Sequence, residues 1–161
     1  EENASGFIFD LNGGKYRLTA MMPNDGISVY NYAKEFCKKS AEEISGIGAF
    51  YGDSTIKAVM PSLDSVYEGS MKNAISAMGT GGIFSSSADF SKIGESSGAS
   101  IAELTQKCRF TLNTDSAQPS PAKSHSDSET ETLTINRPFI FMLTEKENGI
   151  PVLMGIIPQI N

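Results

Sequence analysis

Two apolar runs separated by a polar turn close the chain. Phe139 to Leu143 form the first run, and the second contains Val152 to Met154 with Ile156 and Ile157 after Gly155. Between them, Asn148-Gly149 predicts the tip of a β-hairpin, because both residues tolerate a positive φ. Neither run alternates apolar and polar residues as a strand with one solvent face would. We therefore expect both strands to be covered on both faces by layers from elsewhere in the fold.

The N-terminal segment predicts another hairpin. Phe7-Ile8-Phe9 form its first strand, Asn12-Gly13-Gly14 its turn, and residues 16–22 the returning strand. A helix is predicted over residues 28–39, because four apolar residues recur at helical spacing: Val29, Tyr32, Ala33 and Phe36. Ser40 and Glu43 have the spacing of a capping box that would open a short second helix.

The middle of the chain alternates between strand and helix patterns. Residues 54–61 alternate Ile56, Ala58 and Met60 with the remaining positions, which predicts a half-buried strand. Residues 71–78 have apolar residues at helical spacing (Met71, Ala74, Ile75 and Met78), and Gly79 is placed to end that helix. A glycine- and serine-rich loop follows. Residues 101–113 then predict a long strand with one shared face: Leu104, Cys108, Phe110 and Leu112.

Residues 114–132 have a different composition from the rest of the chain. They contain no Val, Ile, Leu, Met or aromatic residue, and Ser, Thr, Pro and acidic residues dominate. Such a segment buries too little apolar surface to offset the entropy lost on ordering. We expect it to be exposed, mobile and the first site of limited proteolysis.

The order of these elements predicts the fold class. Strand, strand, helix, strand, helix, long strand, loop, strand and strand make an α+β protein with mostly antiparallel sheets and a few helices, rather than a βαβ series.

Composition excludes several classes of function. The 161 residues carry a net charge of −6 and no cluster of Lys and Arg, which argues against nucleic-acid binding. No apolar run reaches the ~20 residues of a membrane span. His125 is the only histidine, so neither a catalytic triad nor a histidine-rich metal site is expected, and no cofactor is expected. Cys37 and Cys108 are predicted to be buried structural thiols. Asn3-Ala4-Ser5 is a candidate N-glycosylation sequon at Asn3.

Four segments together resemble the C-terminal part of a serpin. "INRPFIFMLTEKENGIPVLMGIIPQIN" (135–161) is similar to the closing signature of that family, which includes Asn136, Arg137, Pro138, Phe139 and Gly155. "SSADFSKIG" (86–94), "MPSLDSVYEGSMKNAISAMG" (60–79) and "FDLNGGKYRLTAMMPNDG" (9–26) resemble further family segments in the same order. The resemblance covers nearly all of the chain. It implies a serpin-like fold made of the sheet B and sheet C barrel region and the C-terminal strands of sheet A.

The resemblance also implies that the chain is a partial fold. A serpin typically has more than twice this length, and much of the cover over its terminal hairpin comes from the N-terminal half. Residues 1–161 are therefore expected to be the C-terminal portion of a serpin-like domain, with the N-terminal portion of the same fold as a partner. A complete but minimal domain is the alternative.

By the same resemblance, residues 114–132 correspond to the reactive-centre loop, which a serpin presents to a protease as bait. The hinge of this loop maps to Thr114, Asp115, Ser116, Ala117, Pro119 and Pro121. The family pattern has Glu, then Gly-Thr and small residues, so this hinge departs from it. Proline lacks an amide hydrogen and is poorly tolerated inside a sheet. The Glu–Lys pair of the family hinge is also absent, because Thr114 and Ser62 occupy its two positions.

The scissile bond depends on how the loop is aligned, and this loop is about three residues shorter than usual. Counting back from Asn136 places it near Asp127-Ser128, and counting forward from the hinge places it near Thr130-Glu131. Lys123-Ser124 would suit a trypsin-like protease but lies too close to the hinge for full insertion.

The resemblance implies inhibition of a serine or cysteine protease, and no enzymatic activity. In that mechanism the protease cuts the loop and forms an acyl-enzyme, and the loop inserts into sheet A and distorts the protease. The alternative is a non-inhibitory serpin used as a binding, carrier or chaperone scaffold. The family default is an extracellular location, with a cytoplasmic location as the alternative.

Overall fold

The computed structural model describes residues 2–11, 13–40, 43–44, 56–94, 98–112 and 131–160. In chain order, the main elements are β1 (Ala4–Asp10), β2 (Tyr16–Pro23), α1 (Val29–Phe36), β3 (Ile56–Val59), β4 (Leu63–Ser70), α3 (Lys72–Ile75), β5 (Thr105–Leu112), β6 (Glu131–Thr134), β7 (Phe139–Glu145) and β8 (Ile150–Ile157). The chain divides into two compact units, one made of Glu1–Ser62 with Asn113–Asn161 and the other of Leu63–Leu112. The predicted α+β class with mostly antiparallel strands is confirmed.

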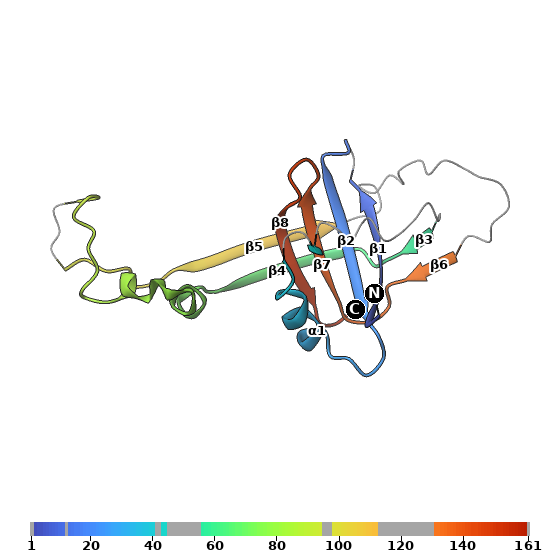
Figure 1. The fold of residues 1–161 in the computed structure, drawn as a ribbon, viewed down its shortest axis with the longest axis horizontal. Coiled ribbons are helices and arrows are strands. Elements are labelled where there is room, and N and C mark those ends of the chain that lie inside the picture. Colours follow the sequence, from blue (N-terminus) through green and yellow to red (C-terminus); the bar gives the residue numbers. More distant parts are fainter. Residues whose placement is uncertain are drawn as a thin grey trace. The chain divides into compact units, whose positions relative to one another are not determined.

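The first unit contains a four-stranded antiparallel sheet in the order β1-β2-β7-β8 (Figure 1). Both predicted hairpins are present in it. Gly13 and Gly14 have φ values of +88° and +68° in the turn between β1 and β2, and Gly149 has +67° between β7 and β8. These positive values explain why glycine occupies the turn positions.

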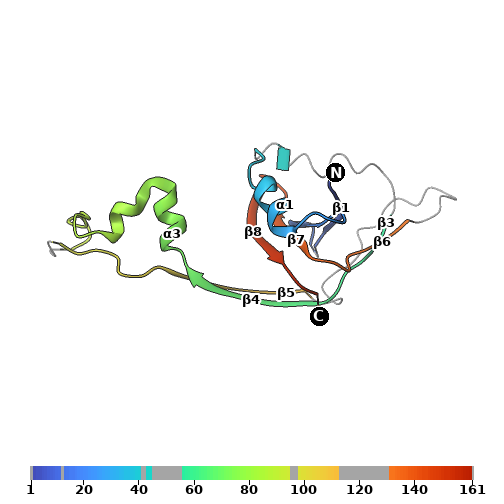
Figure 2. The same cartoon turned by 90° about the horizontal axis from the view of Figure 1, so that it is seen from below.

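Helix α1 packs against one face of this sheet (Figure 2). The four residues predicted to form its apolar face, Val29, Tyr32, Ala33 and Phe36, are all buried. They form a cluster with Ala4 of β1, Met21 of β2, and Ile140 and Met142 of β7. The predicted helix was longer, at residues 28–39, but regular helix ends at Phe36.

The two strands of the terminal hairpin differ in burial. Phe139 to Met142 of β7 are all buried, although successive residues point to opposite faces of the sheet, so the expected cover on both faces is confirmed for β7. In β8, by contrast, four alternating apolar residues are exposed: Ile150 (58%), Val152 (57%), Met154 (41%) and Ile156 (37%). Met154 and Ile156 pair with Met142 and Ile140, so they share the sheet face on which α1 packs. A register shift between Leu143 and Thr144 pairs Ile150 with Glu145, so Ile150 does not share that face. Strand β8 is an edge strand, and these four apolar side chains along it are exposed.

Asp10, at the end of β1, binds one side chain from β2 and one from the turn after β7. Its carboxylate accepts hydrogen bonds from Arg17 Nε at 2.9 Å and from Lys146 Nζ at 2.5 Å, so β1 is tied to β2 and to the turn after β7. Partial burial would raise the pKa of Asp10, but the hydrogen bonds and charges of Arg17 and Lys146 outweigh it and lower the pKa below the ordinary value of 3.8.

We expect Asp10→Asn to destabilise the fold at neutral pH and to have less effect in acid. A carboxyl whose pKa is lowered by folding stabilises the protein above its unfolded pKa, and this contribution disappears as the pH falls through the folded value. Urea unfolding should show a loss of about 1 kcal/mol at pH 7. The difference from wild type should shrink as the pH falls below 3.8. Glu147→Gln, an exposed change in the β7–β8 turn, is the control. A pH-independent effect of Asp10→Asn would contradict the interpretation.

The predicted capping box is also present. The backbone N–H of Ser40 donates to Glu43 Oε2 at 2.6 Å, and the backbone N–H of Glu43 donates to Ser40 Oγ at 3.2 Å. These reciprocal bonds satisfy two amide groups at the start of a helical turn.

The second unit is built on the antiparallel pair β4–β5, and α3 follows β4 (Figure 2). The helix predicted over residues 71–78 is α-helical only in α3 and continues as a π-helical turn (Ser76–Thr80) and a 3-10 turn (Gly81–Phe84). Gly79 has a φ of +88° and interrupts the helical backbone, as predicted for this glycine. The apolar face predicted for this helix is not buried, and Met78 is 77% exposed.

Candidate functional site

The reactive-centre-like segment joins β5 to β6. Residues 113–130 lie outside the described residues, and so do the predicted hinge and most of the candidate scissile positions: Thr114, Asp115, Ser116, Ala117, Pro119, Pro121, Lys123, Ser124, Asp127, Ser128 and Thr130. His125 lies there as well. Glu131, the remaining scissile candidate, is the first residue of β6. The strands on either side of the segment are described, and they define its two roots.

The N-terminal root is β5, which pairs with β4 from Leu63↔Leu112 to Ser70↔Thr105. Leu63 and Leu112 are buried at one end of the pair. On β5, Cys108 and Phe110 are half-buried while Arg109 and Thr111 are exposed, which confirms the predicted alternation. Leu104 was predicted to share that face, but it precedes the strand and is 37% exposed. The alternation gives β4–β5 one apolar face and one polar face.

Ion pairs line the polar face of β4–β5. Arg109 donates to both carboxylate oxygens of Asp64, from Nε at 2.9 Å and from Nη2 at 2.7 Å, and Lys107 pairs with Glu68 at 2.7 Å. The hydrogen bonds and charge of Arg109 lower the pKa of Asp64. These groups are exposed, so their contribution to stability is small. Their geometry instead favours one strand register at the root of the loop.

The C-terminal root is β6, which pairs with β3 in parallel from Ile56↔Glu131 to Val59↔Thr134. The backbone N–H of Ile135 donates to the carbonyl oxygen of Val59 at 2.8 Å and extends this pairing. The strand was expected around residues 133–136, and the loop was expected to run to residue 132. Because residues 131 and 132 pair with β3, they belong to the strand. Of the half-buried face predicted for residues 54–61, Met60 is half-buried but Ala58 is exposed.

The residues of the family signature lie at the start of β7, just before it and in β8. Phe139 is fully buried and pairs with Ile157 of β8. Arg137 forms an ion pair with Asp25, in the turn between β2 and α1. Gly155 pairs with Phe141, and a Cβ atom on Gly155 would lie 2.4 Å from the Phe141 ring. Asn136 and Pro138 are exposed. The buried Phe139, the ion pair of Arg137 and the small size of Gly155 therefore have structural roles.

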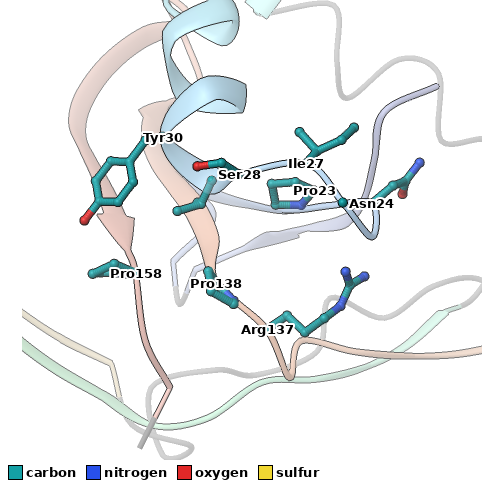
Figure 3. Close-up of a pocket in the computed structure, with 10 residues that line it drawn as sticks. Pro23, Asn24, Ile27, Ser28, Tyr30, Arg137, Pro138 and Pro158 are labelled. Atoms are coloured by element: carbon teal, nitrogen blue, oxygen red, sulfur yellow. The ribbon is translucent and has the colours of Figure 1, made fainter.

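A shallow pocket of about 300 Å³ lies beside this signature. Its wall includes Pro23, Ile27, Tyr30, Arg137, Pro138 and Pro158. Figure 3 shows Tyr30 and Pro158 on one side of Pro138 and the Arg137 side chain extending on the other. Because the Arg137 guanidinium already pairs with Asp25, the pocket offers no unpaired charge from this residue to a ligand.

Other chemistry that the sequence could have supported is limited. In the described ranges, no group of three or more His, Cys, Asp or Glu side chains is placed to hold a metal ion. Cys37 and Cys108 are free thiols, and Cys37 is exposed rather than buried, because it follows the last residue of α1. Cys108 is half-buried.

Among the described residues, none of the helices combines the length and apolar character that crossing a membrane requires.

Comparison with known proteins identifies the family. The family model described as "Serpin (serine protease inhibitor)" matches residues 1–159. No curated protein matches the chain. Among solved structures, it is similar to the thermophilic serpin tengpin in the native state (22% identity, TM-score 0.83, covering 99% of this chain and 43% of that one). It is also similar to native protease nexin-1 with heparin (18% identity, TM-score 0.75, covering 97% and 46%) and to uncleaved ovalbumin (17%, 0.75, covering 97% and 42%).

The family model identifies the family, and the coverages give the extent of the match. Identities of this size show a shared fold, and the chain spans less than half the length of each of these three structures. Because the family model matches nearly all of its residues, the chain belongs to the serpin family, whose members are inhibitors and binding proteins rather than enzymes.

Proposed function

We propose that residues 1–161 are the C-terminal portion of an extracellular serpin that presents residues 114–130 to a serine or cysteine protease. The observation that carries this proposal is the position of the segment. It joins β5, whose partner is β4, to β6, whose partner is β3, and it contains no residue suited to a core. A long polar segment between two paired strands is accessible to a protease, which needs an extended, unpaired backbone.

The hinge sequence restricts the events that cleavage can trigger. An inserting loop becomes a strand of a sheet, and each internal residue must then supply a backbone donor and acceptor. Pro119 and Pro121 supply no donor, and the hinge charge pair is replaced by Thr114 and Ser62, of which Ser62 is exposed. We infer that a protease recognises and cuts the loop but is not trapped in a stable complex.

A second function is favoured by the same prolines. If insertion does not occur, the fold serves as a non-inhibitory binding, carrier or chaperone scaffold. The two functions differ in one respect: in the first, a cognate protease recognises the loop, whereas a scaffold is cut only incidentally.

The test is to incubate the full-length protein and its Pro119→Ala/Pro121→Ala variant with a panel of serine and cysteine proteases. We expect efficient cleavage of the wild-type loop by at least one protease, with no SDS-stable complex, and a covalent complex of that protease with the variant. Ser120→Ala, which keeps both prolines, is the matched control. Slow cleavage by every protease, with no complex from either protein, would favour the scaffold function.

The exposed apolar residues of β8 support a specific partner. We propose that the N-terminal portion of the same serpin fold covers Ile150, Val152, Met154 and Ile156. These four residues lie along one edge strand, and burying apolar surface is favourable by roughly 25 cal/mol for each Å². The remaining half of the fold is long enough to do so, since the matched structures are more than twice as long as this chain.

Two matched valine substitutions test this contact. Val152 is 57% exposed on β8, and Val66 is 58% exposed on the polar face of β4, between Asp64 and Glu68. We expect Val152→Lys to weaken binding of residues 1–161 to a separately produced N-terminal portion by about tenfold or more, because the lysine would have to be desolvated. Val66→Lys should have little effect. Equal effects in a titration would show that the exposed apolar residues of β8 are not the contact.

A further inference from the structure

The sequon Asn3-Ala4-Ser5 lies where the sheet of the first unit begins. Ala4 is the first residue of β1, is 2% exposed, and belongs to the cluster under α1. Asn3 and Ser5, on either side of it, are exposed. Because side chains alternate along a strand, anchoring Ala4 in the core directs Asn3 and Ser5 away from that core.

The backbone around Asn3 is fixed, while its side chain is accessible. The carbonyl oxygen of Asn3 accepts a hydrogen bond from the backbone N–H of Asn24 at 2.9 Å, and Ser5 pairs with Met22 of β2. Within the described ranges, neither the Asn3 amide nor the Ser5 hydroxyl takes part in a hydrogen bond. Both groups that a glycosylating enzyme must reach are thus unengaged, and a substituent on Asn3 would displace no described contact.

We propose that Asn3 is an N-glycan acceptor. This inference rests on the extracellular location proposed above. In the transfer, the Asn3 Nδ2 forms a bond to the anomeric carbon of an oligosaccharide carried on an isoprenoid diphosphate. The bond from that carbon to the diphosphate breaks, the lipid diphosphate leaves, and the amide gives up one proton. The Ser5 hydroxyl supplies the third position of the acceptor sequence.

The test uses the full-length protein, directed into the secretory pathway of cultured eukaryotic cells by an added signal peptide, as wild type, Ser5→Ala and Ser5→Thr. The first change removes the sequon without altering Asn3, and the second preserves it. We expect one glycan on the wild-type and Ser5→Thr proteins, removed by peptide N-glycosidase with conversion of Asn3 to Asp in the peptide mass spectrum. The Ser5→Ala protein should have none.

Unmodified Asn3 in secreted wild-type and Ser5→Thr proteins would overturn the proposal, and so would a glycan at Asn3 that persists in Ser5→Ala. This readout does not depend on protease inhibition, so it fails or succeeds separately from the proposed function.

Discussion

Cleaving the full-length protein between residues 120 and 130 is expected to leave its melting temperature nearly unchanged. In inhibitory serpins, a cut in the loop raises thermal stability sharply, because the freed strand completes sheet A. Here Pro119 and Pro121 would each leave an unpaired carbonyl opposite them in a buried sheet. An unmade buried hydrogen bond costs roughly 1–3 kcal/mol, so the two prolines together cost about 2–6 kcal/mol before any steric clash.

Calorimetry of intact and nicked protein measures this effect, and the substitutions identify its cause. Pro119→Ala/Pro121→Ala should restore a large gain in melting temperature after nicking, whereas Ser120→Ala should behave as wild type. A nicked wild-type protein that melts tens of degrees above the intact one would mean that the hinge tolerates both prolines. In that case this protein would be expected to trap proteases by the mechanism of the family.

Local patterns in the sequence predicted the elements that depend on near neighbours. The turns at Gly13-Gly14 and Gly149 follow from the positive φ that these positions need, and the buried side of α1 follows from its helical spacing. The hydrogen bonds between Ser40 and Glu43 follow from the spacing of three residues in a capping box. In each case, the residues that decide the structure lie within a few positions of one another.

Contacts between distant segments were not predictable in the same way. Arg137 was recognised as part of the family signature, but its partner Asp25 lies 112 positions earlier, and Asp64 lies 45 positions before Arg109. Nothing in a single sequence indicates which carboxylate meets which guanidinium. The parallel pairing of β3 with β6 has the same difficulty, because an apolar pattern does not name its partner strand. Because this pairing was not predicted, the expected end of the loop, residue 132, was two residues too late.

Burial was overestimated for strand β8 and for the helical segment that contains Met78. Both have apolar residues at regular intervals in the sequence, yet Val152 is 57% exposed and Met78 is 77% exposed. The spacing reports which side of an element is suited to a core, while burial depends also on what packs against it. For Phe139 and the rest of β7, the covering elements are present in the chain, and the prediction from sequence was correct.

Phe139→Ala is expected to destabilise the full-length protein by about 3–5 kcal/mol, since it removes a fully buried ring and leaves a cavity. That is a large part of the ~5–15 kcal/mol that keeps a typical domain folded. Urea unfolding should show a lower midpoint with an unchanged slope. Phe139→Leu, which retains much of the apolar volume, should cost less. Asn136→Ala, an exposed change in the same signature, should stay within about 0.5 kcal/mol of wild type. If Asn136→Ala cost as much as Phe139→Ala, burial would not explain the signature, and Asn136 would have to contact a part of the protein outside the described residues.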